Sequence, residues 1–201
     1  MPSWELEREA MSQGCGAVCG CDEAGAGPLA GRVYAAAVIL PDGLDLPWLD
    51  DSKQVTEKRR EALYDQITAQ AAAWSVAWVE PGEIDQIDIL NSRMKAMQLA
   101  IDGLEPKANF ALIDGNRDHG SRCAIVTPHK TIVKGDSLSM SVAAASILAK
   151  VSRDRYMKEM AAVYPQYEFE RHKGYPTKRH YQLLREFGPC LIHRRTFLKK
   201  L

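Results

Sequence analysis

The segment from residue 17 to residue 40 limits the fold more than any other, because it joins two short apolar runs through a glycine-rich turn. Residues 17–21 and 33–40 are rich in Val, Ala, Cys and Ile, the pattern of short buried strands. Asp22 and Glu23 come directly after the first run. Adjacent carboxylates suit a hard divalent cation, and the glycines that follow let a sugar–phosphate chain approach the main chain. The segment therefore predicts a site for a metal ion and a phosphodiester at a strand end.

The rest of the chain mixes strands and helices without a strict alternation of the two. Further strands are expected at residues 74–79 and 109–113, with short extended pieces at 123–126 and 131–133. Helices are expected from Thr56 to Gln70, from Asp88 to about Ile101, from Asp136 to about Val163 and from Thr177 to just before Gly188. These elements predict an α/β fold in which helices cover a mixed sheet, with a helical C-terminal part.

The composition is that of a folded globular protein, with 201 residues of which 46% are hydrophobic and 26% charged. No stretch approaches the roughly 18 apolar residues of a membrane span, and the acidic N-terminus lacks the basic start of a secretion signal. We therefore expect a cytoplasmic protein without a membrane partner. The five cysteines, an odd number, do not predict a disulfide framework. Cys19 and Cys21 share one strand face and are interpreted as small hydrophobic side chains rather than zinc ligands.

Charge is distributed unevenly along the chain, although its formal net charge is zero. Residues 1–129 carry 11 basic and 20 acidic side chains, whereas residues 130–201 carry 15 and 6. This asymmetry indicates an anionic partner on the C-terminal part, unless both halves fold together and their charges interleave. Residues 171–180 and 193–197 combine cations with an aromatic ring, as nucleic-acid contacts do and as a solvated basic loop also does. The five histidines are interpreted as surface or phosphate contacts.

Four carboxylates lie at the end of a predicted strand or at the start of a predicted helix: Asp22, Glu23, Asp114 and Asp136. Asp114 before a glycine is also a common turn residue, and Asp136 before Ser137 is also an ordinary helix cap. If all four converge on one edge of a sheet, their mutual repulsion favours bound cations. Two Mg²⁺ ions about 3.5–4 Å apart would neutralise such a cluster and serve the in-line displacement of a phosphoryl group.

A dinucleotide-binding loop is the main competing interpretation of the glycine turn. That loop needs the spacing G-x-G-x-x-G, whereas Gly31 lies one residue too far from Gly25 and Gly27, and Pro28 interrupts the turn. The preceding carboxylates would also repel a pyrophosphate, and the sequence contains no G-x4-G-K-[ST] loop. A nucleotide cofactor is therefore not expected.

Several segments together resemble the bacterial type 2 ribonuclease H family, ribonuclease HII. The matching segments span nearly the whole chain in the family's order: Asp22-Glu23-Ala24-Gly25, Asp51-Ser52-Lys53, Leu112-Ile113-Asp114-Gly115, Lys134-Gly135-Asp136-Ser137, residues 143–151, His172-Lys173-Gly174-Tyr175-Pro176-Thr177 and His193-Arg194-Arg195. The resemblance implies a ribonuclease H-like mixed β-sheet flanked by helices, with a helical C-terminal extension. Residues 1–163 would form the catalytic domain, and residues 164–201 a substrate-binding part of the same continuous domain.

The resemblance also implies a metal-dependent endoribonuclease, for which a monomer is the simplest expectation. It would cleave the RNA strand of RNA–DNA hybrids and incise duplex DNA on the 5′ side of a single ribonucleotide, leaving 3′-hydroxyl and 5′-phosphate ends. The family's catalytic acids, which bind Mg²⁺ or Mn²⁺, correspond to Asp22, Glu23, Asp114 and Asp136. Its substrate contacts correspond to Gly25, Ala26, Gly27, Lys53 and Tyr175. Tyr175 would lie against the ribonucleotide sugar and Lys53 near a phosphate, while main-chain groups of the turn can read a 2′-hydroxyl.

Two residues depart from the family pattern that the chain resembles. Ala26 stands where the family usually has arginine between two glycines, and Arg32 stands where it commonly has proline. We hypothesise that Arg32 partly replaces the missing cation. Three alternatives remain open at this point: a general DNase of the same fold, a non-catalytic or weakened hybrid-binding protein, and an acidic scaffold with a basic docking tail.

Overall fold

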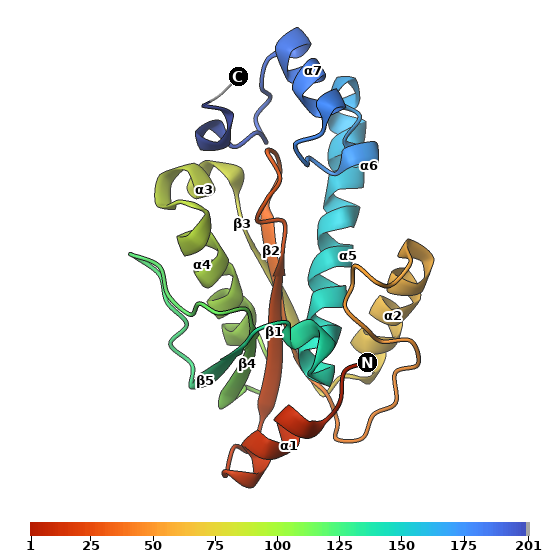
Figure 1. The fold of residues 1–201 in the computed structure, drawn as a ribbon, viewed down its shortest axis with the longest axis vertical. Coiled ribbons are helices and arrows are strands. Elements are labelled where there is room, and N and C mark those ends of the chain that lie inside the picture. Colours follow the sequence, from red (N-terminus) through yellow and green to blue (C-terminus); the bar gives the residue numbers. More distant parts are fainter. Residues whose placement is uncertain (200–201) are drawn as a thin grey trace.

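The computed structural model describes residues 1–199, and its centre is one five-stranded mixed sheet (Figure 1). The strands are β1 (Val18–Ala24), β2 (Val33–Ile39), β3 (Ala73–Val79), β4 (Phe110–Asp114) and β5 (His129–Ile132), in the spatial order β3-β2-β1-β4-β5. Strands β1, β2 and β3 pair antiparallel, whereas β4 pairs parallel with β1 and with β5. The expected mixed α/β fold is confirmed.

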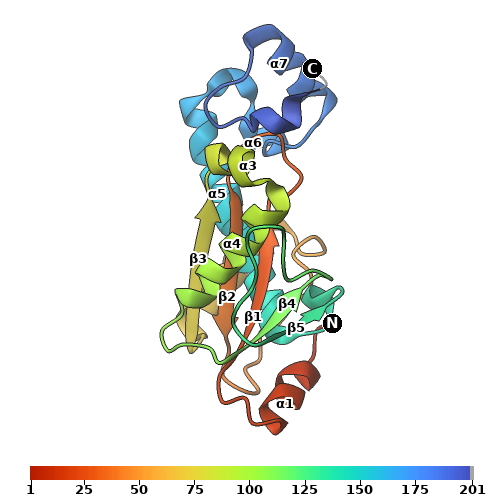
Figure 2. The same cartoon turned by 90° about the vertical axis from the view of Figure 1, so that its left-hand side faces the viewer.

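Helices cover both faces of this sheet, as Figure 2 shows from the side of α4. The α-helices are α1 (Glu5–Ser12), α2 (Glu57–Gln70), α3 (Pro81–Ile87), α4 (Ile89–Asp102), α5 (Met140–Val163), α6 (Phe169–His172) and α7 (Lys178–Phe187). Short 3₁₀ helices are η1 (Gly135–Ser137), η2 (Pro165–Tyr167) and η3 (Arg195–Leu198). Helices α2 and α5 lie on one face and α3 and α4 on the other, while α6 and α7 lie at the far end of α5. Within residues 1–199, no helix combines the length and the apolar character needed to cross a bilayer.

Three of the expected helix starts are confirmed by their side-chain caps. The side chain of Thr56 accepts a hydrogen bond from the N–H of Arg59, and Thr177 accepts one from His180. Asp88 caps α4 in the same way, through the N–H of Asn91. In each case the capping oxygen satisfies an N–H group that has no partner inside the helix.

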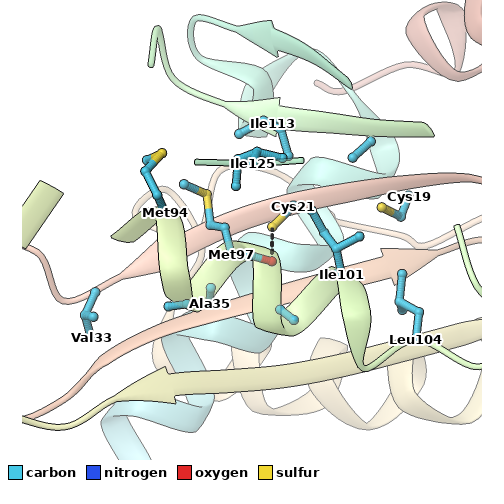
Figure 3. Close-up of a cluster of buried hydrophobic side chains, with 14 of the residues drawn as sticks. Cys19, Cys21, Val33, Ala35, Met94, Met97, Ile101, Leu104, Ile113 and Ile125 are labelled. Carbon is cyan, nitrogen blue, oxygen red and sulfur yellow. Dashed lines mark hydrogen bonds between the residues drawn. The ribbon is translucent and has the colours of Figure 1, made fainter. Parts of the chain in front are cut away.

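Alternation along β1 and β2 divides the core into two layers. Odd-numbered residues such as Cys19, Cys21 and Ala35 pack against α4, which contributes Met94 and Met97 (Figure 3). Even-numbered residues of β2 pack instead against α5 and α2. Both strand cysteines are fully buried and free, so their interpretation as small hydrophobic side chains is confirmed.

Two element boundaries differ from the expected ones in the neighbourhood of the acidic residues. Strand β1 continues through Asp22 and Glu23, because both residues remain paired with β2. Helix α5 begins at Met140 rather than at Asp136, and its N-cap is Ser139. Asp136 lies in the separate helix η1, which follows a left-handed turn at Lys134 (φ 59°).

Helix α5 lies against β1 so closely that Gly20 has no room for a side chain. A Cβ atom at Gly20 would lie 2.1 Å from the carbonyl carbon of Ser141 and 2.2 Å from the nitrogen of Val142. Both are backbone atoms, so the helix as a whole would have to move. The small residues in the middle of α5, which include Ala143, Ala144 and Ala145, allow this approach and are fully buried.

We expect Gly20→Ala to lower the free energy of unfolding by about 3 kcal/mol, the upper end of the usual cost of overpacking. Urea denaturation followed by circular dichroism would measure the change. Gly82→Ala is a suitable control, because a Cβ atom there meets nothing within 4 Å and Gly82 lies in a helix. Equal stability of the Gly20→Ala variant and the wild type would contradict the close packing of α5 on β1.

Candidate functional site

Three chain segments bring the four predicted carboxylates to one end of the sheet. The parallel pairing of β1 with β4 matches Cys21 with Ile113, so the next residues, Asp22 and Asp114, lie side by side where β4 ends and β1 continues to Ala24. Helix η1 joins them because the N–H of Gly135 donates to Asp114 Oδ1 at 2.7 Å. The acids therefore border two cavities of about 240 and 390 Å³, both of which include Asp114 in their walls.

Burial and mutual repulsion disfavour the charged forms of these acids. Burial raises the pKa of Asp22 well above its ordinary value, and the neighbouring charges of Glu23 and Asp114 add to the effect. Burial also raises the pKa of Glu23, although Arg93 opposes the shift. The pKa of Asp136 is raised to about 6 by burial and then by Asp114. The cluster would therefore be stabilised by positive charge.

Two of the acids, Glu23 and Asp22, are held by neighbouring groups of the protein. Glu23 forms an ion pair with Arg93 of α4, with 2.6 Å between Oε1 and Nε, on the sheet face to which odd-numbered residues of β1 point. Asp22 Oδ1 accepts the N–H of Glu23 at 2.7 Å. In the part of the chain that the structure describes, no three Asp, Glu, His or Cys side chains already surround a common point suitable for a metal ion.

The donor atoms nevertheless fit a hard divalent cation. Carboxylate oxygens are the ligands that such ions prefer. Glu23 Oε2 is buried and has no hydrogen-bond partner, and a buried acceptor of this kind is costly unless something binds it. Burial is the main cause of the raised pKa values of Asp22 and Asp136, and the negative charge of neighbouring acids adds to it, so a bound cation would offset both effects.

The glycine turn between β1 and β2 is held by one buried cation, Arg194. Its guanidinium donates to four main-chain carbonyl oxygens at 2.7 to 3.0 Å: those of Gly25, Ala26, Pro28 and Gly31. Burial, together with the neighbouring Arg153, lowers the pKa of Arg194 to about 9. The interpretation of residues 193–197 as a phosphate-contacting or solvated stretch is therefore wrong for Arg194, which binds the protein's own backbone.

The predicted substrate contacts all border the smaller cavity: Gly25, Ala26, Gly27, Lys53 and Tyr175. The Tyr175 ring is 41% exposed and lies above the guanidinium of Arg153, with 5.5 Å between the Cζ atom and the ring centroid. Lys53 borders both cavities, and its pKa is raised, because Asp51 and Asp136 outweigh the effect of burial.

Sequence reasoning did not assign a site role to three residues of α5 that border the same cavity: Ser146, Lys150 and Arg153. Their spacing of four and three residues, which places them on one face of a helix, was the available signal. Lys150 also forms an ion pair with Asp154, one turn further along α5, at 2.7 Å. Arg153 is buried against Gly25, where a Cβ atom would lie 2.2 Å from its Nε atom, so only glycine fits there.

The hypothesis about Arg32 is wrong. Its guanidinium pairs with Glu80 at 2.7 Å and lies between the rings of Trp78 and Tyr156, with ring centroids 4.9 and 4.6 Å away. These contacts hold it away from the cavity, which is bordered by other cations. Arg32 therefore does not replace the arginine that the family usually has in place of Ala26.

The interpretation of the histidines as surface or phosphate contacts is also wrong for three of them. His172, His180 and His193 are all buried, with at most 8% of each residue exposed. They pack together among aromatic side chains such as Phe169. A basic segment with an aromatic residue gives the same local pattern whether its histidines are exposed or buried.

Comparison with known proteins assigns a family to this architecture. The family model described as Ribonuclease HII matches residues 19–200. A ribonuclease HII of Caldicellulosiruptor saccharolyticus is 46% identical over 98% of this chain and 95% of its own length. A ribonuclease HII of Bordetella pertussis is 51% identical over 90% of this chain and 88% of its own. The crystal structure of ribonuclease H2 from Pyrococcus horikoshii matches with a TM-score of 0.74 and 25% identity, covering 90% of this chain and 93% of that chain.

Proposed function

The chain belongs to the ribonuclease HII family and is a ribonuclease H endonuclease; on this premise we propose that it incises duplex DNA on the 5′ side of a single ribonucleotide, in addition to cleaving the RNA strand of RNA–DNA hybrids. The products carry 3′-hydroxyl and 5′-phosphate ends. The main support for the proposal is the cavity that three of the acids, Asp22, Glu23 and Asp114, border together with the glycine turn and Tyr175.

We propose that Asp22, Glu23, Asp114 and Asp136 hold a divalent cation, Mg²⁺ or Mn²⁺. The bound ion would supply activation of the attacking water and neutralisation of the charge that develops on the leaving 3′ oxygen. The support lies in the oxygen donors, in the unpartnered Glu23 Oε2 and in the raised pKa of Asp22. Around these acids the protein's own residues orient the substrate. Lys53 lies where a cation can contact a substrate phosphate, since it borders both cavities.

Recognition of the ribonucleotide is assigned to the turn and to Tyr175. A protein distinguishes RNA from DNA at one position by contacting the 2′-hydroxyl. Gly27 is exposed at the cavity, and a Cβ atom there would contact Tyr175 Cε1 at 3.9 Å, so the turn and the ring lie next to each other on the cavity wall. We propose that the ribose lies against both of them from the cavity side. We also propose that residues 164–201 act as the substrate-binding part of the chain, with Tyr175 as its main contact.

A cleavage assay tests the function directly. The substrates are a labelled DNA duplex with one internal ribonucleotide, an RNA–DNA hybrid and an all-DNA duplex, each with Mg²⁺, Mn²⁺ or a chelator. We expect metal-dependent incision of the first on the 5′ side of the ribonucleotide, cleavage of the second and no cleavage of the third. Cleavage of the all-DNA duplex would support a general DNase instead. Binding without cleavage in any metal would support a non-catalytic hybrid-binding protein.

Tyr175→Ala should lower kcat/KM on the single-ribonucleotide duplex by at least about tenfold, the loss expected when stacking worth roughly 1–3 kcal/mol disappears. Stability should change little, because the ring is 41% exposed. Tyr175→Phe is the matched control, since it keeps the ring above Arg153 and removes only the hydroxyl. Unchanged cleavage by Tyr175→Ala would show that the ring does not contact the ribose.

The predicted cytoplasmic location and monomeric state stay predictions. So does the order of preference between Mg²⁺ and Mn²⁺, which the metal series of the cleavage assay would establish.

A further inference from the structure

The buried histidines form a cluster that neither the fold nor the proposed chemistry explains. His172 ends α6, His180 lies in α7 and His193 lies in the segment before η3, so the cluster joins three parts of the C-terminal region. The His172 and His180 rings stack, with centroids 4.3 Å apart. Burying a polar ring costs free energy unless each ring nitrogen has a hydrogen-bond partner. The partners of these nitrogens therefore indicate which nitrogen carries the proton.

His193 and His180 belong to one chain of hydrogen bonds that runs from Cys190 to Tyr175, and all its donors point the same way. We call this chain the histidine relay. The N–H of Cys190 donates to His193 Nδ1 at 3.0 Å, so the proton of the neutral His193 ring is on Nε2. His193 Nε2 lies 3.0 Å from His180 Nε2, which must then accept. The proton of His180 is consequently on Nδ1, and this atom donates to the main-chain carbonyl of Tyr175 at 2.9 Å.

The rings of His180 and His193 are both neutral at ordinary pH, as the histidine relay requires. Burial lowers the pKa of His180 to about 4, and the neighbouring His172 lowers it further. Burial lowers the pKa of His193 to about 3, with His180 contributing to the shift. Protonation of His180 would place two N–H groups against each other at its contact with His193, and protonation of His193 would do the same at its contact with the N–H of Cys190. The hydrogen bonds therefore agree with two neutral rings.

The relay ends on the residue proposed to contact the ribose. The carbonyl of Tyr175 accepts from His180 and also from the N–H of Thr177 at 2.8 Å, while the N–H of Tyr175 donates to the carbonyl of His172 at 2.8 Å. Only the Tyr175 ring is left to face the cavity. At its other end the relay reaches the glycine turn, because His193 pairs with Ala30 and precedes Arg194. The two proposed ribose contacts, Tyr175 and the glycine turn, are therefore connected through His180 and His193.

We propose that His180 is a positioning residue for Tyr175, and that His193 fixes the His180 tautomer that can donate to the Tyr175 carbonyl. The proposal rests on the proposed function, in which Tyr175 contacts the ribose. In a purely structural role, by contrast, the cluster would only fill the core beside Phe169. Substitutions in it would then lower activity only as far as they lower stability.

Two substitutions at His180 separate these roles, because each keeps one of the two hydrogen bonds. In His180→Asn the side-chain amide nitrogen takes the place of Nδ1 and can still donate to the Tyr175 carbonyl. In His180→Gln the longer side chain reaches the place of Nε2 and can still accept from His193, but the side-chain donor to Tyr175 is lost and that carbonyl keeps only the N–H of Thr177. If the cluster is purely structural, the loss of kcat/KM in each variant should parallel its loss of stability. If His180 positions Tyr175, His180→Gln should lose more kcat/KM than His180→Asn.

The experiment measures kcat/KM on the single-ribonucleotide duplex for the wild type, His180→Asn, His180→Gln, Tyr175→Ala and the double variant His180→Gln/Tyr175→Ala. We expect His180→Gln to lose about tenfold, the effect of roughly one buried hydrogen bond, and His180→Asn to lose about threefold or less. The double variant should match Tyr175→Ala alone, because residues that act through one another are not additive.

Three results would overturn the proposal: wild-type activity in His180→Gln, equal losses in both His180 variants, or additive losses in the double variant. If Tyr175→Ala itself cleaves like the wild type, the proposed role of Tyr175 fails and the positioning role fails with it. If Tyr175→Ala is impaired and His180→Gln is not, only the positioning role fails. Histidine ¹⁵N NMR of the wild type gives a readout that needs no variant to fold. The proposal requires a proton on Nδ1 of His180 and on Nε2 of His193, and the opposite tautomers would overturn it.

Discussion

Asp22→Asn should lower kcat at least about 10³-fold, because a metal site supplies several kcal/mol of transition-state stabilisation and each 1.36 kcal/mol is a factor of ten in rate. The protein should not lose stability. The amide keeps an oxygen that can accept the N–H of Glu23, as Asp22 Oδ1 does at 2.7 Å. It also removes a charge that burial and the neighbouring Glu23 and Asp114 disfavour, as the raised pKa of Asp22 indicates. Loss of activity with equal or higher stability is therefore expected.

A binding readout separates loss of the cation from loss of substrate. Mg²⁺ or Mn²⁺ should raise the Tm of the wild type, because a ligand that binds only the folded state stabilises it, and this rise should be much smaller in Asp22→Asn. Asp45→Asn is the matched control, since Asp45 is exposed and lies away from the cavity walls. Near wild-type turnover in Asp22→Asn, or an equal rise in Tm in both variants, would remove Asp22 from the proposed metal site.

The features that sequence predicted well are those that depend on near neighbours. Thr56, Asp88 and Thr177 each cap a helix through an N–H group three residues away, so the relevant partner is visible in the local sequence. The convergence of the acids was also accessible, because Asp22 and Asp114 each follow a buried apolar run and the ends of parallel strands share one edge.

The features that sequence missed depend on distant partners. The prediction that a helix starts at Asp136 was wrong, because α5 is capped by other residues. Ser139 accepts the N–H of Val142 at 3.1 Å, and Glu7 of the unpredicted helix α1 accepts the N–H of Ser141 at 2.8 Å. The hypothesis about Arg32 was wrong for a similar reason, since its partner Glu80 lies in a later loop. A local pattern reports which side chains are basic or polar, but the tertiary packing decides which are exposed.

Arg194 is the strongest case of a distant partner, and its removal should have a large effect. We expect Arg194→Met to lower the free energy of unfolding by about 3–5 kcal/mol, because a buried donor or acceptor left without its partner costs roughly 1–3 kcal/mol. The substitution removes the donor from four carbonyl groups of the glycine turn, some of which can recover a bond to water. Within residues 1–199, no carboxylate forms an ion pair with Arg194, and four of its five N–H groups donate to the turn.

Urea denaturation measures the loss of stability, and Arg195→Met is the matched control, because the neighbouring Arg195 is exposed. Arg194→Lys should fall between the wild type and Arg194→Met, since an ammonium group keeps the charge but cannot reach all four carbonyl groups at once. The turn carries the proposed ribose contacts, so the same variants should lose cleavage of the single-ribonucleotide duplex in the same order. If Arg194→Met is as stable as Arg195→Met, the turn holds its shape without this cation. In that case β1, β2 and the contacts of Leu29 and Gly31 with the C-terminal segment must be sufficient to fix it.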